Sequence, residues 1–159
     1  MDIPKIYDEI LKAYKALGYP ISDSKLVISS QPTYTDGRLV PSTVLKPNAS
    51  GGNVQDDGTI RINPEYRKVM RHWGLKGSGR DFLRTIIGHE LGHHIDRTQF
   101  QYDPKNKKRS SLLKEIMDSG FHTKYTDSYS KDTDPRKLQK ELLAEYLAHK
   151  VLDQLKRKN

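Results

Sequence analysis

The chain has 159 residues, no cysteine, and 28 lysines and arginines against 20 acidic residues, a formal net charge of +8 at pH 7. This length predicts a single domain over residues 1–159, and the lack of cysteine excludes disulfides and thiolate metal ligands. No apolar run approaches the roughly 18 residues of a membrane-spanning helix, and the N-terminal residues lack the apolar core of a signal peptide. The cytoplasm is therefore the default compartment, with an exported mature form as the alternative.

The N-terminal half predicts one amphipathic helix followed by several short strands. Apolar residues recur at helical spacing, and Gly18-Tyr19-Pro20 ends the helix. Further along, alternating residues around Asp57-Gly58 are typical of a β-hairpin. The predicted elements are a helix at 3–17, strands at 26–29, 38–40 and 43–45, a hairpin at 53–63 and a short helix from 64 to 71.

Residues 80–99 predict a long helix that carries the most informative motif, His89-Glu90-x-x-His93. Side chains at positions i and i+4 share one face of a helix, so both imidazoles can bind one zinc ion. Glu90 can then reach a water molecule on that ion and act as a general base. The alternative is a surface helix that happens to contain histidines.

Two further features support a helix with a specialised face at this place. Ser78 and Asp81 form a capping start. Gly88 and Gly92 stand in the helix interior, where each is about 1 kcal/mol less favourable than alanine. Glycines kept at that cost indicate the close approach of another backbone or of a substrate.

A catalytic zinc site needs three protein ligands and one open position, and the residues just after the motif are poor candidates for the third ligand. His94 points about 100° around the helix from His93. Asp96 is interpreted either as a carboxylate that orients an imidazole or as a surface ion pair. No further histidine occurs before His122. The third ligand must therefore come from a distant part of the chain.

The segment that follows is mostly polar. Residues 105–109 are predicted to be a solvent-exposed loop, 110–117 a short helix, and 120–134 a polar segment with several tyrosines. Asp134-Pro135 marks the start of a long C-terminal helix with an apolar stripe.

Two glutamates of this last helix, Glu141 and Glu145, are the best candidates for the third ligand. They fall on one line with Ala148 and Leu152, at positions i, i+4, i+7 and i+11. A line of carboxylates that becomes apolar is unlike a solvated charged face. We predict that Glu141 binds zinc and that Glu145 accepts a hydrogen bond from a liganding histidine. The reverse assignment, or two exposed glutamates paired along the helix, are the alternatives.

The two motifs and their order resemble the gluzincin metallopeptidases, in which HExxH is followed at a distance by a helix-borne glutamate. Glu141-Leu-Leu-Ala-Glu145-Tyr-Leu is similar to the corresponding segment in the group of the anthrax lethal factor catalytic domain and the Pro-Pro endopeptidases. The resemblance implies that the first glutamate of this segment binds zinc. It covers 89–96 and 141–148 well and the rest of the chain only in outline.

The chain departs from that group at one position. The group carries a tyrosine about seven residues before the liganding glutamate, and its hydroxyl stabilises the oxyanion. This chain has Asp134 at that position. Tyr129 and Tyr125 are the nearest tyrosines, and the context of Tyr129 is the more similar one. The resemblance therefore implies Tyr129 as a catalytic residue, with Tyr125 or an ordinary loop tyrosine as alternatives.

Together the patterns predict an α+β, zincin-like fold: a small mixed or antiparallel sheet packed on the HExxH helix, with a C-terminal glutamate-bearing helix. The predicted activity is zinc-dependent hydrolysis of peptide bonds in a protein or peptide substrate. We expect strand 59–63 to be an exposed sheet edge that pairs with an extended substrate. An ordinary strand without substrate contact is the equal alternative.

Two other functions fit the sequence. A regulatory metallopeptidase of the ImmA/IrrE type also pairs HExxH with a downstream helix containing glutamate, and would cut one specific protein. A basic nucleic-acid-binding domain would make the motif incidental. Basic residues are denser at 105–109 and 156–158, but no aromatic residues are interleaved with them, so a solubilising surface is favoured. No pattern indicates the substrate sequence, a toxin role or the oligomeric state.

Overall fold

The computed structural model describes residues 3–28, 33–35, 38–40, 52–54, 58–62, 64, 66–72, 77–126 and 134–157. The helices are α1 (Ile3–Ala16), α2 (Tyr66–His72), α3 (Gly79–Gln99), α4 (Lys107–Ser119), α5 (Phe121–Thr126) and α6 (Pro135–Arg157). The strands are β1 (Lys25–Ile28), β2 (Thr33–Thr35), β3 (Arg38–Val40), β4 (Gly52–Val54) and β5 (Thr59–Ile62). The described part is therefore mostly helical with a small sheet, and it belongs to the α+β class.

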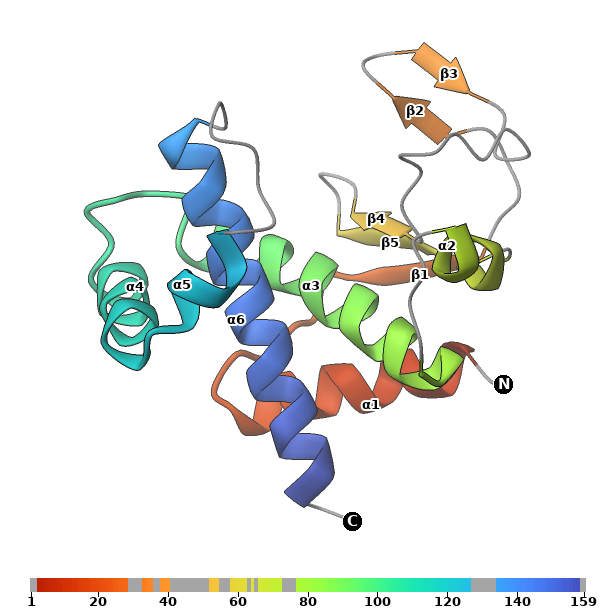
Figure 1. The fold of residues 1–159 in the computed structure, drawn as a ribbon, viewed down its shortest axis with the longest axis horizontal. Helices are drawn as coiled ribbons and strands as arrows, with labels where there is room; N and C mark the ends of the chain where they lie inside the picture. The colour runs from red at the N-terminus through yellow and green to blue at the C-terminus, as the bar shows by residue number, and fades with distance from the viewer. Residues whose placement is uncertain are drawn as a thin grey trace.

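Helix α3 lies at the centre of the arrangement, with α6 crossing it on one side and α1 packed against it on another (Figure 1). Its start is the predicted one, because the side chain of Ser78 accepts a hydrogen bond from the Asp81 backbone N–H at 3.1 Å. Ile87, Leu91 and Ile95 repeat every four residues and are fully buried. Each such burial contributes about 1.5–3 kcal/mol. No helix in the described ranges is long and apolar enough to cross a bilayer.

The two interior glycines of α3 bring α6 unusually close. A Cβ atom on Gly92 would lie 2.9 Å from both the Cα and the carbonyl oxygen of Ala144. One on Gly88 would lie 3.3 Å from the Cα of Ala148. The predicted close approach of another backbone is thus confirmed, and the backbone belongs to α6. As a result, side chains on the facing surfaces of α3 and α6 meet without an intervening apolar layer.

The main sheet has three strands in the order β1-β5-β4. β1 runs parallel to β5, with Leu26 opposite Ile60, and β4 runs antiparallel to it, with Val54 opposite Ile60. The prediction that 59–63 forms an edge strand is wrong, because β5 is paired on both sides and has no backbone groups left for a substrate. Alternation alone indicates a strand, whereas its place in the sheet depends on distant pairing partners.

Ile60 and Ile62 of β5 are fully buried in the core, and β4 and β5 both pack on α3. β2 and β3 form a separate antiparallel pair. The hairpin predicted over 53–63 is confirmed by the β4–β5 pairing, and Gly58, one of the two predicted turn residues, has φ +86°. Asp57 and the strand predicted at 43–45 lie outside the described residues.

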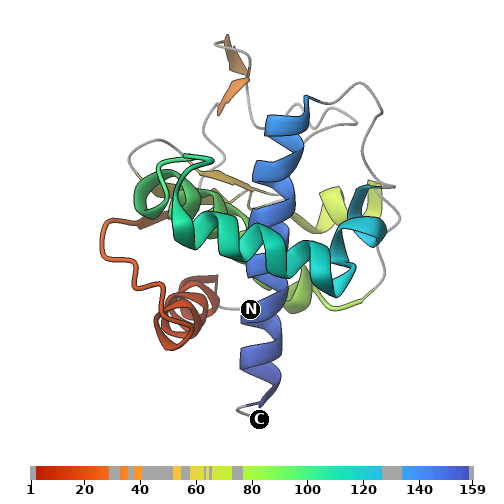
Figure 2. The same cartoon turned by 90° about the vertical axis from the view of Figure 1, so that its left-hand side faces the viewer.

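Helix α4 begins earlier than predicted and crosses α6 (Figure 2). The side chain of Asn106 caps it by accepting a hydrogen bond from the Arg109 N–H at 3.1 Å. The predicted solvent loop at 105–109 is therefore wrong from Lys107 onward. Arg109 is 2 % exposed and pairs with the fully buried Asp96, Nε to Oδ1 at 2.7 Å. The buried partner on α3 draws Arg109 into the core, whereas Lys105, Lys107 and Lys108 of the same run stay exposed.

The C-terminal helix begins where the sequence predicts. Asp134 accepts hydrogen bonds from the N–H of Arg136 at its side chain and of Leu138 at its carbonyl, both at 2.9 Å. Leu143, Leu147 and Val151 are fully buried at four-residue spacing. The segment before α6 was predicted only as polar, but its first part forms α5.

Candidate metal centre

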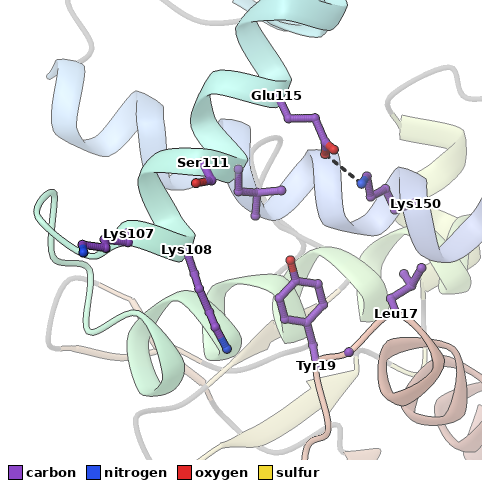
Figure 3. A pocket seen from close by; sticks show the side chains of 9 residues that line it. Leu17, Tyr19, Lys107, Lys108, Ser111, Glu115 and Lys150 are labelled. Atoms are coloured by element: carbon purple, nitrogen blue, oxygen red, sulfur yellow. Dashed lines mark ion pairs between the residues drawn. The ribbon is translucent and has the colours of Figure 1, made fainter.

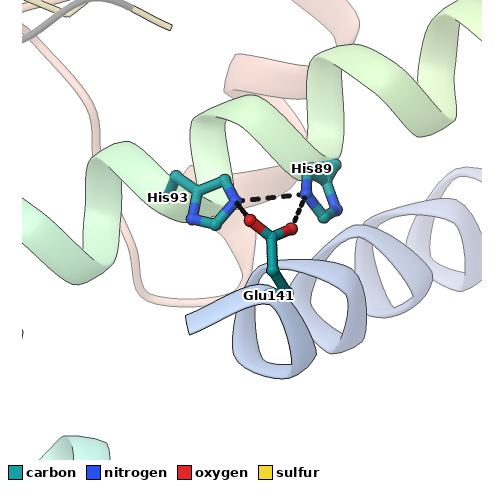
Figure 4. A group of neighbouring side chains, drawn as sticks. All are labelled: His89, His93 and Glu141. Atoms are coloured by element: carbon teal, nitrogen blue, oxygen red, sulfur yellow. Dashed lines mark hydrogen bonds and ion pairs between the residues drawn. The ribbon is translucent and has the colours of Figure 1, made fainter. Parts of the chain in front are cut away.

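Three side chains from α3 and α6 converge where the helices cross (Figure 4). The Nε2 atoms of His89 and His93 lie 3.1 Å apart. The carboxylate of Glu141 lies against both: one oxygen is 2.9 Å from His89 Nε2 and the other 3.1 Å from His93 Nε2. All three side chains are 15–24 % exposed. These residues form a group that could hold a metal ion.

The spacing of the donor atoms suits a small tetrahedral ion. Zinc binds imidazole nitrogen and carboxylate oxygen at about 2.0–2.2 Å, which places neighbouring tetrahedral donors about 3.3 Å apart. The separations of 2.9 and 3.1 Å between the two imidazoles and the carboxylate are close to that edge length. Two neutral imidazoles and one carboxylate also favour zinc over calcium or magnesium, because the latter two ions bind oxygen donors almost exclusively.

Glu145 holds one of the imidazoles in place from the other side. His89 Nδ1 donates to Glu145 Oε2 at 2.6 Å. A neutral His89 with its proton on Nδ1 has a lone pair on Nε2, the atom that faces His93 and Glu141. Glu145 therefore selects the tautomer that can ligate a metal. Among the described residues, it lies outside the metal-binding group itself.

The two carboxylates control the charge of His89. Burial alone would lower the pKa of this imidazole, but the hydrogen bonds to Glu141 and Glu145 outweigh burial and raise the pKa to about 10. Burial would in turn raise the pKa of each glutamate. Hydrogen bonds to His89 and His93 instead hold the pKa of Glu141 well below its usual range, and those to His149 and His89 lower that of Glu145 to about 2. Without a metal, the site therefore holds a proton where the ion would bind.

One member of this network was indicated in the sequence only by its spacing from Glu145. His149 Nε2 lies 3.4 Å from Glu145 Oε1, so Glu145 contacts one histidine with each oxygen. The ring of His149 packs edge-on against Phe121 of α5, with centroids 5.1 Å apart. In a sequence, the i, i+4 spacing of Glu145 and His149 is also typical of a surface pair, so it carries no functional signal by itself.

A second contact from outside the motif supports α3 at the site. The hydroxyl of Tyr14, which is fully buried, donates to the carbonyl oxygen of Gly88 at 2.5 Å. Gly88 directly precedes His89, so α1 fixes the backbone that carries the first histidine. Nothing local in the sequence of α1 marks Tyr14 as more than a core residue.

Glu90 and the tyrosines complete the predicted set. Glu90 follows His89 on α3, is partly buried, and its charge helps to raise the pKa of His89. It does not belong to the metal-binding group found in the described part of the chain. Tyr129 lies outside the described residues, as does the side chain of Tyr125, whose backbone belongs to α5.

His94 and Asp96, which lie just after the motif, make other contacts. His94 is buried between Asp23 Oδ1, 2.8 Å from its Nε2, and Arg97 Nη2, 2.8 Å from its Nδ1. It faces away from the metal-binding group, as its angle around the helix predicts. Both interpretations of Asp96 are wrong, because its carboxylate is buried and pairs with Arg109 instead of a surface group or a liganding imidazole.

Comparison of the chain with protein-family models, with curated proteins and with solved structures finds no match in any of the three. The gluzincin resemblance therefore stays a prediction from two short motifs. What the site can do follows from its own donor atoms and charges.

Proposed function

We propose that this chain is a single-domain zinc metallopeptidase of the gluzincin type. The observation that carries the proposal is the meeting of three donors from two distant segments. His89, His93 and Glu141 approach within 2.9–3.1 Å of one another although 48 positions separate His93 from Glu141. If the two histidines shared a helix face only by chance, no carboxylate from a distant segment would be expected at ligand distance from both. Nor would a second carboxylate be expected to bind the other nitrogen of one imidazole, as Glu145 does.

The surrounding architecture supports the same proposal. A small mixed sheet packs on the HExxH helix and a C-terminal helix delivers the glutamate, which is the layout expected for a zincin-like domain. The charge pattern suits catalysis as well, because strongly shifted pKa values in a partly open cluster are typical of functional sites.

In this proposal each residue has a defined task. His89, His93 and Glu141 hold the ion, and Glu145 holds His89 in the ligating tautomer. When bound, zinc supplies Lewis-acid activation of a water molecule, lowering its pKa toward about 7. Glu90 takes a proton from the attacking water as its oxygen bonds to the peptide carbonyl carbon. The C–N bond then breaks, and Glu90 gives the proton to the departing amine nitrogen.

Exchange of Glu90 for glutamine tests this assignment. The amide cannot accept the proton, so we expect Glu90→Gln to bind one equivalent of zinc and to lose cleavage of an unstructured protein such as casein by at least about 10²-fold. Metal content is measured by elemental analysis and cleavage by the release of peptides. His93→Ala is the matched variant, and it should lose both zinc and activity.

Two results would overturn the proposal. Wild-type protein that binds no zinc and cleaves neither casein nor a peptide library contradicts the enzyme assignment. Cleavage by Glu90→Gln at the wild-type rate contradicts the role of Glu90 as the base.

A further inference from the structure

A cavity of about 450 Å³ lies outside the metal centre, between the end of α1, the first turns of α4 and the second half of α6 (Figure 3). Its volume falls within the range of small-molecule sites, although it is wide open to solvent. Lys150 is the α6 residue that lines the cavity, and it lies nine positions after Glu141. Nine residues amount to about 13 Å along a helix and half a turn around it. The cavity is therefore on the side of α6 opposite the metal-binding group.

The charged groups of this cavity are mostly positive. Lys107, Lys108 and Lys150 line it together with a single carboxylate, that of Glu115. Lys150 Nζ pairs with Glu115 Oε2 at 2.7 Å, and this contact lowers the pKa of Glu115. Within the described residues, no acidic side chain pairs with Lys107 or Lys108. Glu115 compensates one of the three ammonium groups and leaves two positive charges. That of Lys108 extends toward Tyr19, whereas that of Lys107 lies at the rim and points away from the other lining side chains (Figure 3).

The remaining surface of the cavity is apolar with two hydroxyl groups. Leu17 and Leu112 provide aliphatic side chains, and Leu112 is only 6 % exposed. The ring of Tyr19 stands between Lys108 and Leu17 in Figure 3, held edge-on against Phe100 with centroids 6.1 Å apart. Ser111 adds a hydroxyl beside the lysines. The cavity thus combines a cationic part with an apolar part.

We propose that this cavity binds a small phosphate monoester with an apolar or aromatic body. A phosphate monoester carries about −1.5 to −2 charges at pH 7, which matches the two uncompensated positive charges better than a single carboxylate does. Lysine ammonium groups bind phosphate as point charges with freely oriented donors, so they need no planar fork geometry. Leu17, Tyr19 and Leu112 contact the body. The proposal does not depend on the peptidase assignment.

Calorimetric titration with phenyl phosphate tests this site, with inorganic phosphate and phenol as the partial ligands. We expect saturable binding of phenyl phosphate with one site per chain, and at least threefold weaker binding of either partial ligand. Lys107→Gln combined with Lys108→Gln should weaken the binding of phenyl phosphate by about fivefold to tenfold, as expected for the loss of two partly exposed charge contacts.

The matched control is Lys12→Gln combined with Lys156→Gln, which removes the same net charge from exposed positions that do not line the cavity. It should leave the affinity within twofold of wild type. Equal weakening by both pairs would mean general electrostatic attraction, and would overturn the proposal. So would the absence of saturable binding, or binding of inorganic phosphate as tight as that of phenyl phosphate.

The titration is run with and without one equivalent of zinc. Binding that requires zinc, or that His93→Ala abolishes, would place the ligand at the metal centre and also overturn the cavity proposal. Failure of the peptidase assays would leave the titration unaffected, so the two proposals are separable.

Discussion

His89 is the residue at which the charges of the candidate metal centre meet. One ring nitrogen contacts Glu145 and the other contacts Glu141, and both carboxylates favour the protonated imidazole. The pKa of about 10 means that His89 is charged at neutral pH as long as no metal is present. A metal ion and this proton therefore compete for the same nitrogen.

From this competition we predict that zinc binding releases a proton. With the pKa of His89 raised from 6.5 to about 10, this imidazole alone should release about one proton per zinc bound at pH 7, and the zinc-bound water of the proposed mechanism adds part of a second. The apparent zinc affinity should accordingly rise at least about tenfold per pH unit between pH 7 and 8. Calorimetry in two buffers of different ionisation enthalpy measures the number of protons released.

Glu145→Gln is the control for this prediction. It removes one of the two carboxylates that raise the pKa of His89, so this pKa should fall and fewer protons should leave at pH 7.5 to 8. A wild-type value near zero would show that His89 is neutral before zinc binds, contrary to the raised pKa.

The grouping of His89, His93 and Glu141 could be predicted from the sequence, because few residue types can bind a metal ion. A chain without cysteine leaves histidine and carboxylates as zinc ligands, and helical spacing restricts which of them share a face. His149 and Tyr14 could not be assigned in this way. In the sequence, His149 looks like an ordinary surface residue and Tyr14 like an ordinary core residue. Only the three-dimensional structure shows that they contact Glu145 and the Gly88 carbonyl.

At the scale of elements, the crossing of α3 and α6 depends on the absence of side chains at Gly92 and Gly88. We predict that Gly92→Ala destabilises the fold by about 1–3 kcal/mol, because the new methyl would lie 2.9 Å from the α6 backbone, which cannot yield as a side chain can. Wider helix separation should also weaken zinc binding. Denaturant unfolding and zinc titration measure the two effects.

Gly88→Ala provides the matched comparison on the same helix. Its methyl would approach Ala148 to 3.3 Å, which a small shift relieves, and alanine favours the helix by about 1 kcal/mol. We therefore expect Gly88→Ala to be much milder than Gly92→Ala. Equal stability of the two variants would contradict the close backbone contact at Ala144.

Whether a segment forms a helix or a strand was predictable where its apolar residues recur with a clear period. Which other elements it packs against or pairs with was not predictable. Regular apolar spacing predicts α1, α3 and α6, and the hairpin signal predicts β4 and β5. The position of β5 at the sheet centre depends on β1, which pairs with it from more than 30 residues away. Similarly, the polar run before Ser110 reads as a loop, because the partner that buries Arg109 is Asp96 of α3, which the local sequence does not indicate.

At the scale of the whole molecule, a metal ion would join α3 to α6 and so link two distant parts of the chain. Any ligand that binds only the folded state stabilises it, by about 2.7 kcal/mol at a hundred times its Kd. We predict that zinc at this excess raises Tm by about 5–10 °C, as expected for a domain of this size. Thermal unfolding with zinc or with a chelator measures the shift.

His93→Ala should show the same Tm with zinc and with the chelator, because one ligand is missing. A zinc-dependent shift of wild-type size in this variant would mean that the stabilising ion binds elsewhere. The overall α+β class followed from the order of predicted elements, whereas the cavity between α1, α4 and α6 had no sequence signal, since its lining comes from three separated segments.

The buried pair of Asp96 and Arg109 has a consequence for how the molecule opens. Separating α4 from α3 would leave one unpaired charge in an apolar interior, which costs several kcal/mol. Local fraying of α4 alone is therefore unfavourable. Amide protons at the C-terminal end of α3 and in the first half of α4 should exchange with solvent together, as one cooperative unit. Asp96→Leu combined with Arg109→Met, which leaves no buried charge unpaired, should uncouple them.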